Sequence, residues 1–139
     1  MPQVDLYHHQ VRTALIKDGW TITHDPYVLE FKGRRVYADL GAEKPLAAEK
    51  DNLKIVVEIK VFGTPSLMTE LEKALGQYGI YRTFLRRTSP DRKLYLAIPV
   101  DIHQSFFQEG AIQEIVADYA LNLLVFDAET EVVVEWITN

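Results

Sequence analysis

Hydrophobic and polar residues alternate in several short stretches of this chain and recur at helical spacing in two longer ones. In the stretch 54–60 the branched residues at odd positions point to one side of an extended backbone, while Glu58 and Lys60 emerge on the other. A carboxylate and an ammonium group are therefore expected side by side on one face of a strand. The β-branched and aromatic residues of 35–40 predict a preceding strand that carries Asp39.

The rest of the pattern predicts further helices and strands. Residues 5–18 fit an amphipathic helix, with Asp5 as its cap and Gly19 as its stop. The longest expected helix covers 65–86, with Thr64 before it and Pro65 in its first turn. Shorter helices are expected over 102–107 and 111–119, and strands over 20–23, 27–31, 93–100, 123–127 and 132–137.

Two connections bear on how the strands are joined. A tight turn at 32–34 predicts that the strands on either side of it form a hairpin. Residues 46–49 fit a strand extension and an irregular segment equally well. The order of elements predicts a single α/β domain over 1–139, with a mixed central sheet flanked by helices.

Composition excludes several kinds of protein. The chain has 139 residues, of which 47% are hydrophobic and 25% charged, a mixture typical of a soluble globular domain. It contains no cysteine, so a disulfide framework and a thiolate zinc site are excluded. No apolar run reaches the roughly 20 residues that span a bilayer, and the N-terminus lacks the pattern of a signal peptide. A cytoplasmic protein is expected.

The net charge of -5 argues against a protein that coats nucleic acid through a generally basic surface. It does not exclude a nuclease, because acidic metal ligands add to the negative total. One basic cluster stands out, formed by Arg82, Arg86, Arg87, Arg92 and Lys93. These side chains suit a nucleic-acid backbone, and those near the end of the 65–86 helix also oppose its macrodipole; the two interpretations are evenly matched.

Asp39, Glu58 and Lys60 are the residues with the clearest chemical meaning. Asp39 and Glu58 on neighbouring strands can approach each other to about 5 Å, and such carboxylates bind Mg²⁺ or Mn²⁺. A bound cation of this kind polarises a phosphodiester, and Lys60 can stabilise the negative charge that develops during hydrolysis. The alternative is a solvated strand face with a chance upstream aspartate.

The order of these residues resembles that of the PD-(D/E)xK nuclease superfamily. Its signature is an acidic residue at the end of one strand, Glu-x-Lys on the next strand, and a helix after it. Ala38 stands where proline often precedes the acidic residue. The following helix carries Gln77 and Tyr81, which look like the Gln-x-x-x-Tyr motif of the RecB-like exonuclease branch. The resemblance implies a restriction-endonuclease-like fold, a Mg²⁺ or Mn²⁺ cofactor, and deoxyribonuclease chemistry, with Gln77 and Tyr81 on the substrate.

The same branch uses an N-terminal histidine as a further metal ligand. His8 and His9 are the candidates here, and His8 is preferred. The alternative for either residue is a surface imidazole. Glu49 is another candidate ligand if its segment folds over the site, but a solvated ion pair with a neighbouring lysine is the favoured interpretation.

Nearly the whole chain also resembles one narrower family. Stretches around 14–26, 39–44, 47–50, 57–60, 71–78, 94–99 and 123–127 look like the XisH family, the fdxN-element excision controlling factors of cyanobacteria. The resemblance implies a role in programmed DNA excision, with DNA, a small XisI-like protein and a site-specific recombinase as partners. Self-association stays open.

Two functions are consistent with the sequence. The first is a DNA-processing enzyme of the XisH type with a metal site at Asp39 and Glu58, assisted by Lys60. The second is a non-catalytic accessory protein that keeps the nuclease fold and controls a recombinase through protein contacts. The preserved acidic pair and lysine favour the first function, and the acidic net charge favours the second.

Overall fold

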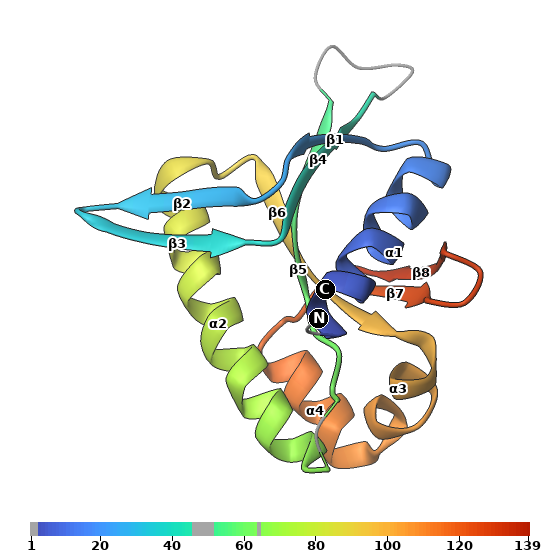
Figure 1. The fold of residues 1–139 in the computed structure, drawn as a ribbon. Coiled ribbons are helices and arrows are strands. Elements are labelled where there is room, and N and C mark those ends of the chain that lie inside the picture. The colour runs from blue at the N-terminus through green and yellow to red at the C-terminus, as the bar shows by residue number, and fades with distance from the viewer. Residues whose placement is uncertain (1–2, 46–51, 64) are drawn as a thin grey trace.

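A mixed six-stranded sheet forms the centre of the protein (Figure 1). The computed structural model describes residues 3–45, 52–63 and 65–139. The strands are β1 (Thr21–His24), β4 (Leu40–Lys44), β5 (Leu53–Ile59), β6 (Arg92–Pro99), β7 (Leu123–Asp127) and β8 (Val132–Ile137), in the spatial order β1-β4-β5-β6-β7-β8. The pairs β5–β6 and β6–β7 are parallel, and the other three are antiparallel. The expectation of a mixed sheet flanked by helices is confirmed.

A separate two-stranded sheet is formed by β2 (Tyr27–Phe31) and β3 (Arg34–Ala38). The two strands pair antiparallel, which confirms the predicted hairpin. The hairpin lies across α2 (Leu67–Thr88), and Phe31 meets Phe84 of that helix edge to face at 6.0 Å (Figure 1). Residue Asp39 alone joins β3 to β4, so the chain passes from the small sheet into the large one at this residue.

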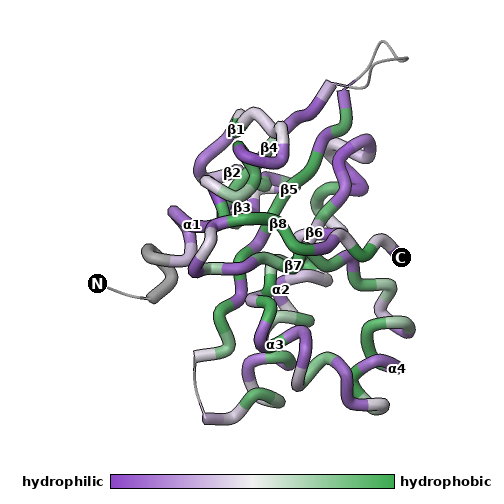
Figure 2. The backbone as a smooth tube through the Cα atoms, turned by 90° about the vertical axis from the view of Figure 1, so that its right-hand side faces the viewer, coloured by the Kyte–Doolittle hydropathy of each residue, from purple (hydrophilic) through white to green (hydrophobic). Residues whose placement is uncertain are grey.

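The two faces of the six-stranded sheet bury two separate hydrophobic clusters. One face packs against α1 (Gln3–Lys17), where Val11 and Leu15 are fully buried. The other face packs against α2 and the hairpin. The short elements α3 (Val100–Gln104), η1 (Phe106–Gln108) and α4 (Gly110–Asp118) extend the second cluster. Figure 2 shows hydrophobic stretches of backbone concentrated where the strands cross the middle of the molecule.

Alternation along β5 agrees with its prediction. Ile55, Val57 and Ile59 belong to the cluster under α1, and Val56 belongs to the cluster under α2. Glu58 lies on the same side of the strand as Val56, so its carboxyl group enters the interior beneath α2. This alternation is what brings an ionisable side chain into an otherwise apolar layer.

Several predicted boundaries are wrong. The single helix expected over 102–107 is instead α3 and η1, which are separated at Ser105. The strand expected over 35–40 ends at Ala38, and the following segment forms β4, which its Gly-Ala-Glu-Lys composition did not indicate. Helix α2 begins at Leu67 instead of residue 65, because the Ser66 hydroxyl caps it by accepting a 3.3 Å hydrogen bond from the Thr69 N–H. Helix α1 begins at Gln3 rather than at residue 5.

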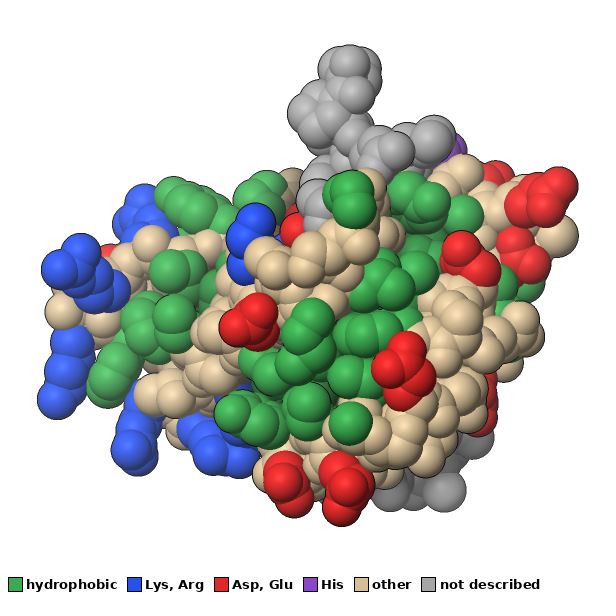
Figure 3. Space-filling model, turned by 90° about the horizontal axis from the view of Figure 1, so that it is seen from below, with side chains coloured by type: hydrophobic (Ala, Val, Ile, Leu, Met, Phe, Trp, Pro, Cys, Tyr) green, Lys and Arg blue, Asp and Glu red, His purple; other side chains and the backbone are tan. Residues whose placement is uncertain are grey.

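The surface is uneven in charge. Seen from below in Figure 3, most Lys and Arg side chains gather on one side of the molecule, and Asp and Glu side chains are scattered over the rest of that view among hydrophobic and uncharged groups. Within the described residues, no helix combines the length and apolar character that crossing a membrane requires.

Candidate functional site

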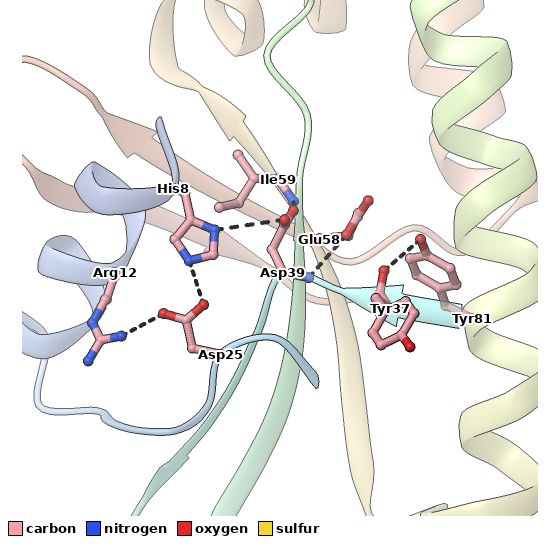
Figure 4. A network of polar contacts seen from close by, with 8 residues as sticks. All are labelled: His8, Arg12, Asp25, Tyr37, Asp39, Glu58, Ile59 and Tyr81. Atoms are coloured by element: carbon pink, nitrogen blue, oxygen red, sulfur yellow. Dashed lines mark hydrogen bonds and ion pairs between the residues drawn. The ribbon is translucent and has the colours of Figure 1, made fainter. Parts of the chain in front are cut away.

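Asp39 is held against the end of β5 by two hydrogen bonds, one with the Glu58 side chain and one with the Ile59 backbone. The register of β4 and β5 pairs Leu40 with Val57, which places Asp39 opposite Glu58. The Asp39 N–H donates to Glu58 Oε1 at 3.2 Å, and the Ile59 N–H donates to Asp39 Oδ2 at 2.7 Å. Figure 4 shows Asp39 between His8 on one side and Glu58 on the other. The two carboxyl groups predicted from the sequence are therefore neighbours at the end of β5.

The environment of Glu58 favours its neutral form. Its side chain is 9% exposed, and burial together with the nearby Asp39 carboxylate raises its pKa to about 9. The charge of Lys60 acts in the opposite direction but is outweighed. Glu58 is thus protonated at neutral pH, and positive charge bound beside it would favour its ionisation.

Helix α1 contributes a network of polar side chains on the Asp39 side. His8 Nε2 lies 2.7 Å from Asp25 Oδ1, and its Nδ1 lies 3.8 Å from Asp39 Oδ1. Arg12 donates to the other Asp25 oxygen at 2.5 Å. When His8 donates from Nε2 to Asp25, its Nδ1 lone pair faces the Asp39 carboxylate. Orientation of a histidine by a carboxylate on its second nitrogen is the usual arrangement at metal sites.

Asp25 is a residue that sequence reasoning missed. It sits in the turn between β1 and β2, 17 residues from its histidine partner, and only the fold brings the two together. The Asp25-Pro26 sequence signals a turn, and nothing in that signal points to His8 or Arg12.

Helix α2 closes the opposite side of the site. Lys60, just beyond the end of β5, has its Nζ 3.7 Å from Glu70 Oε2. Lys73 approaches the other Glu70 oxygen at 3.8 Å. Glu70 is 7% exposed, so this ion pair lies largely out of solvent on the Lys60 side. Glu70 was not predicted as a site residue, and its place in the first turn of an amphipathic helix gives no hint of the contact.

Tyr81 is also part of this side. Its hydroxyl donates to the Tyr37 carbonyl at 3.0 Å, and the residue is 7% exposed. Burial, with the nearby Glu58 and Asp39 groups adding to it, raises the pKa of Tyr81 to about 12. The hydroxyl is therefore a permanent donor. It links α2 to the hairpin in this structure instead of facing solvent.

Gln77 lies one helical turn before Tyr81, on the stripe of α2 that also carries Glu70. Its Oε1 is buried and accepts no hydrogen bond within the described part of the chain. An amide oxygen without a partner is costly in the interior, so this acceptor is available to a donor that enters the site.

The other candidate ligands lie apart. His9 is 75% exposed at its side chain and sits 4.0 Å from Glu131 Oε2. Glu49 falls outside the described residues. In the parts of the chain that the structure describes, no three His, Asp or Glu side chains are gathered closely enough to enclose a cation. The structure brings Asp39, Glu58 and His8 to one place, with Lys60 beside them, but does not aim all their donor atoms at one point.

Comparison with known proteins identifies the family. The family model described as "XisH protein" matches residues 1–134. An XisH family protein from Nostoc punctiforme has the same fold, with a TM-score of 0.88 and 38% identity over 96% of this chain and 100% of that one. A fdxN element excision controlling factor protein from Anabaena variabilis superposes with a TM-score of 0.87 and 40% identity, over 96% of this chain and 99% of the other. No curated protein matches the chain. The chain belongs to the XisH family.

Proposed function

We propose that this protein is a DNA-processing factor in the programmed excision of a DNA element, with a metal-dependent phosphodiesterase-type site at Asp39, Glu58 and Lys60. The family match supports the biological role, since one structural relative is named a fdxN element excision controlling factor. The observation that carries the chemical part is the pair of hydrogen bonds, to Glu58 and from the Ile59 backbone, that fixes Asp39 beside Glu58 at adjacent strand ends. Placing the fold in the restriction-endonuclease-like group belongs to the same proposal, as does a cytoplasmic location.

The donor set fits Mg²⁺ or Mn²⁺. Asp39 and Glu58 supply oxygen atoms, and His8 offers a nitrogen already oriented by Asp25. Burial and the nearby Asp39 raise the pKa of Glu58 to about 9 despite the charge of Lys60, so the two carboxyl groups have too little positive charge beside them to ionise together, and such a position suits a cation. Bound there, a divalent ion would polarise the scissile phosphate and lower the pKa of a bound water.

The remaining side chains have defined tasks in this proposal. Lys60 stabilises the charge that develops on the phosphate, and Glu70 positions its ammonium group. Gln77 offers its free amide oxygen and its amide donors to the substrate. Tyr81 contacts the substrate once its hydroxyl leaves the Tyr37 carbonyl.

A second function is favoured by a specific observation. Lys60 is committed to Glu70, and Tyr81 to Tyr37, as expected if these residues stabilise the fold alone. The protein would then be an accessory factor that controls a site-specific recombinase through contacts with it or with a small XisI-like protein.

Metal binding and cleavage separate the two functions. Calorimetric titration of Mn²⁺ into wild type should show one site, and Asp39→Ala should abolish it. Single-stranded, duplex and branched DNA are then tested for Mn²⁺-dependent cleavage by both proteins. Mn²⁺ binding with DNA cleavage supports the enzyme, and Mn²⁺ binding without cleavage supports the accessory factor. If wild type shows neither, the proposed metal site is wrong.

A further inference from the structure

One side of this acidic protein is strongly basic. Segments 30–35 and 82–93 carry eight of the 15 Lys and Arg residues and two of the 20 Asp and Glu residues. The hairpin packs on α2, so these segments adjoin, and Figure 3 shows the resulting concentration of blue side chains. Both acidic residues are already paired, Glu30 with Arg35 at 2.7 Å and Asp91 with Lys54 at 3.2 Å. The other cations of this side are left without a matching carboxylate in the described structure.

Four of these cations surround a hollow between α2 and the start of β6. The hollow has a volume of about 210 Å³, and Arg82, Arg86, Arg92 and Lys93 line it. Among the described residues that form its walls, none contributes an Asp or Glu side chain. A recess of this size with several cations is suited to a phosphate group.

The wall of the hollow is held in place by several contacts. Arg82 donates from Nη1 to the Tyr119 carbonyl at 2.6 Å, and its guanidinium lies 5.3 Å from the centre of the Tyr78 ring. Tyr78 in turn donates to the Leu94 carbonyl at 3.1 Å and accepts from the Asn122 N–H at 3.0 Å. The bond to the Tyr119 carbonyl uses one of the five N–H donors of Arg82. It fixes the orientation of the guanidinium and leaves the other donors available to a ligand.

The helix macrodipole does not account for the cluster. Arg86 and Arg87 are in the last turn of α2, where cations are stabilised by about 0.3–1 kcal/mol. Arg82 lies a full turn earlier, and Lys93 is on a strand. Arg82 and Arg86 are also four residues apart on one helix face, an arrangement of like charges that is mildly unfavourable. Arg92 points into the interior, where it donates a 3.2 Å hydrogen bond to the Ile55 carbonyl, and its positive charge adds to that of the hollow it lines.

We propose that this hollow binds a phosphate group through Arg82 and Arg86, and that the phosphate belongs to a nucleic-acid backbone. Lys93 borders the hollow from β6, but it shares the strand face of Ile55 and Tyr95, on the other side of the sheet. The identity of the ligand rests on the proposed role in DNA processing. The hollow and the Asp39–Glu58 pair lie against different faces of α2, because Arg82 contacts the carbonyl of Tyr119 and its neighbour Tyr81 contacts that of Tyr37. Backbone binding at the hollow therefore leaves the candidate metal site open and does not depend on it.

The test compares two double variants that remove the same charge. Arg82→Ala/Arg86→Ala removes two cations that line the hollow, and Arg34→Ala/Arg87→Ala removes two exposed cations from the same side that do not line it. Binding of a fluorescent 20-base-pair duplex is measured by anisotropy in EDTA at several salt concentrations. Calorimetry with inorganic phosphate reports a soluble ligand, and circular dichroism checks that each variant is folded.

The hollow variant should weaken duplex binding at least about tenfold and reduce the salt slope by about one to two. The control variant should change the affinity less than about threefold. Phosphate binding that the hollow variant abolishes, without duplex binding, would assign the same site to a soluble phosphate. Equal losses in the two variants, or no binding of either probe, would overturn the proposal. Asp39→Ala should bind the duplex like wild type, so failure of cleavage alone counts only against the catalytic proposal.

Discussion

The two sides of the Asp39–Glu58 pair offer contrasting surroundings. On the α1 side, His8, Arg12 and Asp25 form a partly exposed network of charged groups around Asp39. On the α2 side, Glu58 is buried beneath Tyr81 and beside the Lys60–Glu70 ion pair, and burial raises its pKa. The α1 side of the pair is thus partly exposed to solvent, and we call it the wet half; the α2 side is buried, and we call it the dry half. A cation would find a prepared ligand set on the wet half and would have to displace a proton on the dry half.

Removing Lys60 should have the largest effect on the dry half. If Lys60 stabilises charge in the transition state, Lys60→Ala should lower the cleavage rate about 10²–10³-fold while Mn²⁺ affinity changes little. Single-turnover cleavage and calorimetry measure the two quantities. Lys73→Ala is the matched control, because Lys73 also approaches Glu70, at 3.8 Å, from a more exposed position. Parallel loss of cleavage and metal binding would mean that Lys60 only holds the carboxyl groups in place.

Disrupting the wet half should weaken metal binding. His8→Ala and Asp25→Asn should each reduce Mn²⁺ affinity about 10–100-fold, because Asp25 orients the imidazole. His9→Ala should leave the affinity unchanged, since His9 points toward Glu131. Calorimetric titration compares the three variants. An unchanged affinity in His8→Ala would show that His8 serves only the ion pair with Asp25.

The raised pKa of Glu58 predicts that stability falls with pH. Between its ordinary pKa near 4.5 and its folded pKa of about 9, the folded state keeps a proton that the unfolded state has released. The free energy of unfolding should therefore decrease by up to about 1.4 kcal/mol per pH unit across this window. Urea unfolding at pH 5 to 9 measures the slope, and Glu58→Gln should remove it.

The control for this slope is Glu43→Gln, a half-buried carboxyl on neighbouring β4, which should retain it. Added Mn²⁺ should flatten the slope in wild type, because cation binding requires the ionised carboxylate. A slope that persists in Glu58→Gln would assign the linkage to another group.

The smallest expected effect is that of Tyr81→Phe. It removes the bond to the Tyr37 carbonyl and should cost about 1 kcal/mol of stability. Tyr37→Phe leaves that carbonyl in place and should be close to neutral, because the Tyr37 side chain is 54% exposed. Denaturation measures both. A large loss of cleavage in Tyr81→Phe without loss of stability would assign Tyr81 to the substrate.

The sequence predicted the regular elements best where burial sets the pattern. The alternation in β5 and the apolar run of β6 determine both strands, and Gly33 determines the turn of the hairpin. Strand β4 was missed because it contains a glycine, a residue that is depleted in strands and typical of irregular segments. A Cβ at Gly41 would lie 2.7 Å from Tyr27 Cδ2, so the close approach of the hairpin excludes a side chain there.

The candidate site divides in the same way. The sequence predicted Asp39, Glu58 and Lys60, because an acidic residue at a strand end followed by Glu-x-Lys on the next strand is a pattern that can be read locally. The contacts of Asp25 and Glu70 join elements far apart in the chain, so they depend on how helices α1 and α2 dock and not on any local pattern. The hydrogen bond of the Tyr81 hydroxyl likewise depends on the hairpin lying across α2.

The passage of the chain from one sheet to the other at Asp39 couples the site to a distant surface. The hairpin rests on α2 through Phe31 and Phe84, and its last strand ends one residue before the carboxylate. Any tilt of the hairpin thus moves the backbone of Asp39, and with it both bonds to β5. The hairpin and the acidic pair therefore share one backbone junction, and the packing of the hairpin on α2 contributes to holding the Asp39 carboxylate against the end of β5.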